Sequence, residues 1–259
     1  MWLLDPPADL ALYYPPDYLS RLSSERLARI ARRESYQIGH ILGHLDVSSP
    51  HLGRLVEIGA GAGVFALQAK QAGFDVTAIE QDGGACSWLT DQIGVRAVQS
   101  GDPAVALEAE APARVIALWQ SLEHLPDPWR FLEAAASKLE PGGILVIATP
   151  NPDSLSFRAM GSRWPHLDAP RHLWLFPIEV LSERLDRVGL QMVAGILDDP
   201  GAASWNRFAW IRLMTNLVSS RAWTAASFAV GSTMAAVLRP IELGRRSASY
   251  TAIFGKPRT

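Results

Sequence analysis

The sequence predicts an α/β fold built on a doubly wound, mostly parallel β-sheet of the Rossmann-like type. Three observations lead to this prediction: short apolar runs alternate with segments of helical periodicity, the first run ends at a cluster of glycines, and residues 144–148 are almost wholly apolar. Strands separated by helices form βαβ units with parallel strands, and a strand buried on both faces is continuously apolar. With 259 residues, 48% of them apolar, the chain can form one large domain plus an elaboration.

An N-terminal arm and helices are expected over residues 1–50, ahead of the sheet. Residues 1–20 are rich in proline, tyrosine and aspartate, a composition that disfavours a regular helix. From Ser20 to Leu45, apolar residues recur at helical spacing among many charges, which predicts one or two amphipathic helices. Pro50 and Gly53 then mark the end of this region.

The α/β core is expected over residues 51–200, where strands and helices alternate. The predicted strands are residues 55–58, 75–79, 95–98, 114–118, 144–148 and 191–196. The predicted helices are residues 64–72, 84–92, 104–108, 128–139 and 177–188. The last of these helices has Pro177 at its first position and Gly189 just past its end, which is the usual asymmetry of helix termini.

Residues 201–245 have a different character and predict a helical insertion, before residues 246–259 complete the core with a last strand at 250–254. The insertion is rich in Trp, Ala, Ser, Val and Met and carries no charge from Ala222 to Leu238. That run reaches the lower bound for spanning a bilayer, but its Ser, Thr and Gly content weakens a spanning interpretation. Three tryptophans lie near three arginines, as suits an interfacial helix: Trp205, Trp210 and Trp223 beside Arg207, Arg212 and Arg221.

Three interpretations of the insertion therefore stay open: a packed helical lid or homodimer surface, contact of residues 202–243 with a membrane surface, and a true membrane span. The formal net charge of -2 and the pI near 6.3 provide no global field for gripping nucleic acid, so no nucleic-acid partner is expected. Cys86 is the single cysteine, which excludes an intramolecular disulfide and a cysteine-based zinc site within this chain. Without a signal-peptide pattern at the N-terminus, we expect a cytoplasmic protein, peripheral at the inner membrane face if the insertion contacts lipid.

A glycine-rich turn follows the first predicted strand, at residues 59–63. In open parallel sheets, ligands bind beyond the carboxyl ends of the strands, and glycines let the backbone approach them closely. Glu57, at the end of the strand, could accept a hydrogen bond from a cationic ligand group. A dinucleotide fingerprint requires a third glycine where this chain has Val64, and Glu57 would repel a pyrophosphate. The turn therefore favours a ligand with an amino group and no phosphate.

Polar residues also follow the next three predicted strands. Glu80 could chelate a ribose diol by accepting from both hydroxyl groups, Asp102 could accept from an adenine amino group, and Trp119 with Gln120 would lie near a transferred group. Each alone also has a structural interpretation, as a surface Glu, a turn Asp or a core Trp, but their recurrence at successive strand ends favours a site. The candidate cofactor-binding residues are Glu57, Gly59, Ala60, Gly61, Gly63, Glu80, Gln81, Gly101, Asp102, Trp119 and Gln120.

Four stretches, at residues 56–63, 122–128, 139–151 and 170–176, resemble motifs of the class I S-adenosylmethionine-dependent methyltransferases. The resemblance covers roughly residues 5–200 and is nearest to the bacterial branch of ubiquinone-biosynthesis and surface-polysaccharide methyltransferases. It implies a seven-stranded sheet with one antiparallel strand. It also implies S-adenosylmethionine as cofactor, with S-adenosylhomocysteine as the product.

Methyl transfer from a sulfonium is an in-line displacement, so the enzyme mainly aligns the reactants. A base is needed only for a poor nucleophile such as a sugar hydroxyl or a phenol. His124 and His172 are the candidate bases, because the unperturbed histidine pKa lies near cytoplasmic pH; alternatively, His124 positions its loop and His172 orients the substrate. Arg171 and Trp164 are candidate acceptor-binding residues. No residue spacing suggests a metal site.

These features predict methyl transfer from S-adenosylmethionine, to an oxygen of a small-molecule, glycan or lipid-linked acceptor. A catalytically silent protein that uses the same fold for binding or assembly is the main alternative. A dinucleotide-dependent oxidoreductase is disfavoured by the missing glycine.

Overall fold

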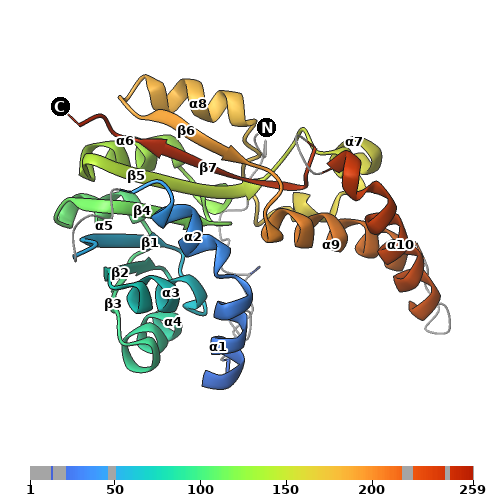
Figure 1. The fold of residues 1–259 in the computed structure, drawn as a ribbon, viewed down its shortest axis with the longest axis horizontal. Coiled ribbons are helices and arrows are strands. Elements are labelled where there is room, and N and C mark those ends of the chain that lie inside the picture. Colours follow the sequence, from blue (N-terminus) through green and yellow to red (C-terminus); the bar gives the residue numbers. More distant parts are fainter. Residues whose placement is uncertain (1–12, 14–21, 46–50, 218–223, 243–245, 259) are drawn as a thin grey trace.

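The computed structural model describes residues 13, 22–45, 51–217, 224–242 and 246–258, and its centre is a seven-stranded sheet of order β3-β2-β1-β4-β5-β7-β6 (Figure 1). The strand β7 is antiparallel to both of its neighbours, whereas the other pairs are parallel. The predicted fold class is therefore confirmed, including its single antiparallel strand. The strands are β1 Arg54–Ile58, β2 Asp75–Glu80, β3 Arg96–Gln99, β4 Ala113–Trp119, β5 Leu139–Pro150, β6 Gln191–Ile196 and β7 Ser249–Gly255.

Helices cover both faces of the sheet (Figure 1). On one face pack α1 Ser24–Arg33, α2 Tyr36–Leu42, α3 Val64–Ala72, and α4 Gly83–Trp88 with the π-helical turn Leu89–Ile93. On the other face pack α5 Pro103–Ala109, α6 Pro128–Lys138 and α8 Ile178–Asp186. Because β1 and β4 are neighbours in the sheet while the chain runs outward to opposite edges from them, their carboxyl ends mark the switch point at which α/β sheets bind ligands.

Most predicted elements of the core are present, and the differences are local. The predicted strand 144–148 is the centre of the longer β5, and the predicted helix 84–92 changes from α to π geometry after Trp88. The placement of Pro177 at a first helical position was wrong: its extended backbone makes it the N-cap, and α8 begins at Ile178. Two amphipathic helices precede the sheet as predicted, and the irregular arm falls almost wholly outside the described residues.

The insertion between β6 and β7 is helical, as predicted, and consists of α9 Pro200–Asn216 and α10 Thr224–Glu242. The Asp199 carboxylate accepts from the Ala202 amide at 2.7 Å and so caps α9. The two helices pack closely at Gly231, where a Cβ would lie 2.6 Å from the Cα of Ile211. This α9–α10 pair extends beyond the end of the sheet and also packs on α7 Leu155–Met160 (Figure 1). Within the described part of the chain, no helix has the length and apolarity needed to cross a bilayer.

Candidate functional site

A cavity of about 290 Å³ opens at the carboxyl ends of β1 and β4, the position expected for a ligand in this architecture. Residues of the glycine turn and of the β4 end line one side. Residues of α2 and of the α9 N-terminus line the other. The lining residues are Glu34, Tyr36, Gln37, Glu57, Gly59, Ala60, Val64, Phe65, Trp119, Gln120, Ala148, Asp199, Gly201, Ala202, Ser204, Trp205, Ser249 and Thr251.

The glycine turn is held in a backbone conformation that side chains rarely adopt. Gly59, Gly61 and Gly63 have φ values of 70°, 53° and 77°. A Cβ on Gly59 would lie 2.9 Å from the Cβ of Ser121, and a Cβ on Gly63 would lie 2.9 Å from atoms of Leu89 and Ile93. Gly59 and Ala60 line the cavity. At Gly63, a side chain would clash with the π-helical turn. At Gly59, the lack of a side chain avoids a clash with Ser121 and also leaves the backbone accessible from the cavity.

Glu57 places an acidic group in the wall of the cavity. Its side chain is 3% exposed, and its Oε2 is buried without a hydrogen-bond partner among the described residues. Burial raises the pKa of Glu57 from 4.5 to about 8, and the nearby charge of Glu80 adds to the rise. An orphaned carboxylate oxygen beside a cavity is suited to a cationic ligand group, which would restore both the charge balance and the hydrogen bond.

Glu80 is held tightly at the end of β2. Its Oε1 accepts from the amides of Gln81 at 2.8 Å and Asp82 at 3.2 Å, and its Oε2 accepts from the Gly61 amide at 3.0 Å. Each carboxylate oxygen has two lone pairs, so Oε2 retains capacity for one further donor. Glu80 therefore orients the glycine turn; it is 7% exposed and lies outside the cavity lining.

The carboxylate of Asp102 caps a helix and forms an ion pair, two contacts that the sequence did not reveal. Its Oδ1 accepts from the amides of Ala104 and Val105 and caps α5, while its Oδ2 forms an ion pair with Arg130 at 2.9 Å. The hydrogen bond from the Val105 amide, together with Arg130, lowers the pKa of Asp102. The side chain is 48% exposed and lies outside the cavity lining. A structural role thus accounts for Asp102, and the neighbouring Gly101 is exposed with open space around it.

Trp119 and Gln120, at the end of β4, both line the cavity as the sequence predicted. The Trp119 ring packs on Phe65 with centroids 5.3 Å apart, and its buried Nε1 has no hydrogen-bond partner in the described chain. Gln120 has φ of 54°, an uncommon value for a residue other than glycine, and its Nε2 donates to the Ser249 Oγ at 3.0 Å. Trp119 and Gln120 therefore contribute an aromatic ring and an amide group to the cavity wall.

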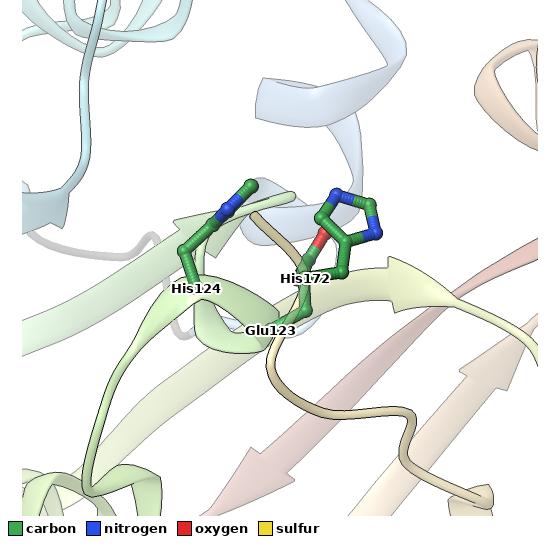
Figure 2. A group of neighbouring side chains, drawn as sticks. All are labelled: Glu123, His124 and His172. Atoms are coloured by element: carbon green, nitrogen blue, oxygen red, sulfur yellow. The ribbon is translucent and has the colours of Figure 1, made fainter. Parts of the chain in front are cut away.

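His124 and His172 lie together (Figure 2). Neither residue is part of the cavity lining. Their ring centroids are 4.6 Å apart. The Nδ1 of His124 is 3.0 Å from the carbonyl oxygen of Arg171, and the Nδ1 of His172 is 2.9 Å from that of His166. Burial lowers the pKa of His124 to about 4 and also lowers that of His172, so both rings are neutral at pH 7. These contacts join the loop after β4 to the segment before α8.

Glu123 completes this cluster, and sequence reasoning missed it. It is fully buried; its Oε2 accepts from the Thr149 hydroxyl at 3.0 Å, and burial raises its pKa to about 8. One side-chain ligand atom each from Glu123, His124 and His172 lies within 4.8 Å of the other two (Figure 2). Although the spacing in the sequence suggested no metal site, these three residues form a group that could hold a metal ion. The Glu-His pair at the end of a strand was the available signal.

The two predicted acceptor-binding residues have other contacts in the structure. Trp164 is 2% exposed, donates to the Ser156 Oγ at 2.9 Å and packs in the core below α9. Its burial makes it a packing residue, which corrects the prediction of substrate contact. Arg171 forms an ion pair with Asp168 at 2.6 Å and lies outside the cavity lining.

Tyr36 and Asp199 line the side of the cavity formed by α2 and the start of α9, and sequence reasoning missed both. Asp199 accepts from Thr251 Oγ1 at 3.1 Å and lies 3.2 Å from the His40 Nε2. Burial acts to raise the pKa of Asp199, but the hydrogen bonds from His40, the Ala202 amide and Thr251 lower it overall. Burial, followed by the charge of Asp199, raises the pKa of Tyr36, so its phenol stays protonated. The signal for Asp199 was an acidic residue after β6, which ends at the same sheet edge.

A model of the methyltransferase domain family matches residues 14–194. Among curated proteins, the ubiquinone biosynthesis O-methyltransferase of Caulobacter sp. (strain K31) is 31% identical over 103 residues, which cover 38% of this chain and 41% of the relative. The corresponding protein of Caulobacter vibrioides is 28% identical over 166 residues, which cover 59% of this chain and 66% of the relative. The chain thus spans about two fifths to two thirds of the length of these relatives.

Solved structures with the same fold extend over most of the chain. A SAM dependent methyltransferase from Archaeoglobus fulgidus has a TM-score of 0.59 at 19% identity and covers 96% of this chain and 100% of that one. The cyclopropane synthase MmaA2 from Mycobacterium tuberculosis has a TM-score of 0.58 at 15% identity and covers 86% of this chain and 84% of that one. These likenesses show the fold.

Proposed function

The chain belongs to the methyltransferase domain family, and from this premise we propose that it transfers a methyl group from S-adenosylmethionine to an oxygen of a small-molecule, glycan or lipid-linked acceptor. The family match supports the predicted enzyme class and cofactor, and it leaves a dinucleotide-dependent oxidoreductase without support. The observation that carries the proposal is the buried, orphaned Oε2 of Glu57 beside the glycine turn.

The residues around the turn fit a sulfonium nucleoside. Glu57 would accept from the ammonium group, Glu80 would accept from a ribose hydroxyl through its remaining Oε2 capacity, and Gly59 would let the ligand approach the backbone. When bound, the cofactor supplies an electrophilic methyl group on a positively charged sulfur. The chain itself binds the reactants, orients them in line and excludes water.

The acceptor side of the cavity favours a neutral hydroxyl. Glu34 and Asp199, on this side of the lining, are both acidic, and no lysine or arginine is among the described lining residues. An anionic acceptor would be repelled there. The protonated Tyr36 hydroxyl can donate a hydrogen bond to an acceptor oxygen, and Trp205 offers an apolar wall. Arg171, outside this wall, is better explained as the partner of Asp168.

His124 and His172 lie outside the described cavity lining. They can act as bases only for an acceptor that approaches them from beyond this cavity. Their Nδ1 contacts with backbone carbonyls instead support the alternative interpretation, in which His124 and His172 position the β4 loop. We also propose that the protein works in the cytoplasm, and a homodimer stays compatible with its surface. Neither point is needed for the cofactor proposal.

The proposal is tested by incubating the purified protein with S-adenosylmethionine carrying a deuterated methyl group and with extracts of cells lacking the gene. Mass spectrometry should reveal a labelled product, absent with a Gly59→Val variant that cannot form the turn. Cofactor binding without any labelled product from aqueous or lipid extracts would instead support a catalytically silent binding protein. Failure to bind the cofactor at all would contradict both functions.

A further inference from the structure

We infer that the α9–α10 pair docks on the surface of a membrane containing anionic lipids. This docking does not require methyl transfer; only the further statement that the acceptor is lipid-linked rests on the proposed function. Three features of the pair lead to the inference: exposed apolar side chains, exposed charges of one sign, and direct continuity with the cavity.

The helix α10 exposes most of its large apolar side chains. Ser227, Gly231 and Ala235, which are small, form the buried stripe that packs on α9. Met234 and Leu238 also pack inward. The other four large apolar residues face outward, with exposed fractions of 47% for Phe228, 50% for Val230, 69% for Val237 and 53% for Ile241. A helix of a soluble domain normally buries its large apolar residues against the core. The outward face of α10 is therefore suited to an apolar environment outside the protein.

Exposed apolar residues concentrate in this part of the molecule. Six of the twelve large exposed apolar residues in the described chain belong to α9, α10 or the residue that follows α9: Phe208, Leu217, Phe228, Val230, Val237 and Ile241. Exposed apolar residues gathered on one pair of helices favour an interaction surface there. No described helix is long and apolar enough to cross a bilayer, so contact with a membrane would lie at its interface.

The exposed charges around the outward face are positive, which favours an anionic partner. Arg207, Arg212 and Arg239 are exposed, whereas Glu242, the acidic residue within the two helices, is fully buried and accepts from the Trp210 indole at 2.8 Å. The Arg207 guanidinium lies over the Phe228 ring, 5.7 Å from its centroid, which brings positive charge into the apolar face. Apolar side chains flanked by arginines match an anionic lipid surface. A second copy of the chain would oppose arginine to arginine, with no exposed acid from these helices to offset it.

The same helices reach the cavity. Gly201, Ala202 and Trp205, in the first turns of α9, line it, while the far end of the pair extends beyond the sheet (Figure 1). Docking of the outward face would thus place a membrane next to the acceptor-facing side of the cavity. If the proposed function holds, an acceptor with a lipid tail could present its hydroxyl there without leaving the membrane.

Vesicle sedimentation tests this inference with the full chain. We expect binding to vesicles of phosphatidylcholine and phosphatidylglycerol, and much weaker binding to phosphatidylcholine alone. A Phe228→Glu, Val237→Glu double variant should lose at least about tenfold in partition, because two exposed apolar groups can no longer insert. The matched control is Val105→Glu, Val180→Glu, which changes residues with exposed fractions of 49% and 42% on α5 and α8 and should bind as wild type.

Four results separate the outcomes. Equal vesicle binding by the α10 double variant and the control would overturn the inference, as would binding to neutral and anionic vesicles alike. A dimer in vesicle-free solution that the α10 substitutions convert to monomer would assign the face to a second copy instead. Titration with S-adenosylhomocysteine should be unchanged in both variants, so failure to bind vesicles with intact cofactor binding would remove the docking and leave the proposed function standing.

Discussion

The side of the cavity beside the glycine turn and the side beside α9 are assembled in different ways. On the first side, Glu57 and Gly59 lie at the end of β1 and Trp119 ends β4. Each of these positions follows from the local sequence of one strand and the turn after it. Tyr36 and Asp199, on the other side, come from helices before and after the core and meet only when the sheet has formed. The side beside the glycine turn is thus encoded locally, whereas the side beside α9 depends on tertiary packing.

The largest expected effect comes from the turn itself. Gly59→Ala should lower the free energy of unfolding by about 2–3 kcal/mol, because it combines a left-handed backbone with a Cβ placed 2.9 Å from the Cβ of Ser121. The matched control is Gly39→Ala on α2, where a Cβ meets nothing within 4 Å; it should be neutral or stabilising by up to about 1 kcal/mol. Urea denaturation measures both, and equal effects would show that the turn is not constrained.

Glu57→Gln should weaken S-adenosylhomocysteine binding about 30-fold, which corresponds to about 2 kcal/mol for a charge-assisted hydrogen bond. Glu34→Gln is the matched control, because Glu34 also lines the cavity but is paired with Arg33 at 2.9 Å. Calorimetric titration should show the control within about twofold of wild type. A similar loss in both variants would assign the effect to the general negative field of the cavity.

The pH dependence of binding sharpens the role of Glu57. Since its pKa lies near 8 in the empty protein, most of the carboxyl is protonated at pH 6, and a cationic ligand group must displace that proton. Affinity should therefore rise between pH 6 and 7.5, by at most about tenfold per pH unit. The slope should disappear in Glu57→Gln. An affinity that falls as pH rises would have the wrong sign for this assignment.

The smallest loss of stability is expected from breaking a contact on the side of the cavity beside α9. His40→Ala removes the 3.2 Å contact with Asp199 that links α2 to the start of α9, and should lower Tm by about 2–4 °C for a loss of about 1 kcal/mol. Binding of S-adenosylhomocysteine should stay within about twofold of wild type. Arg29→Ala on the exposed face of α1 serves as the control. A large loss of cofactor affinity in His40→Ala would show that the two sides of the cavity are not separable.

The same contrast explains what the sequence could reveal. Strand and helix alternation predicted the parallel sheet, and the family resemblance implied its single antiparallel strand. Residues at strand ends pointed to Glu57, Trp119 and Gln120, which line the cavity. Contacts between distant segments were beyond such reasoning. Arg130 engages Asp102 across 28 positions, and Trp164, which looked available to a substrate, is buried by α9.

The resemblance to class I methyltransferases, carried by four local motifs, is confirmed by the family match over residues 14–194. The residues that line the other side of the cavity lie mostly beyond these motifs, in α2 and in the insertion that begins at α9. Which of these residues line the cavity depends on how α9 packs at the edge of the sheet. The periodicity of the sequence alone does not encode this packing.

The most direct test of the central claim compares two ligands on the wild-type protein by calorimetry. Because Glu57 presents an orphaned carboxylate beside a turn without a phosphate cradle, S-adenosylhomocysteine should bind stoichiometrically and NAD⁺ should give no measurable heat of binding. Retention of NAD⁺ with no response to S-adenosylhomocysteine would contradict the account.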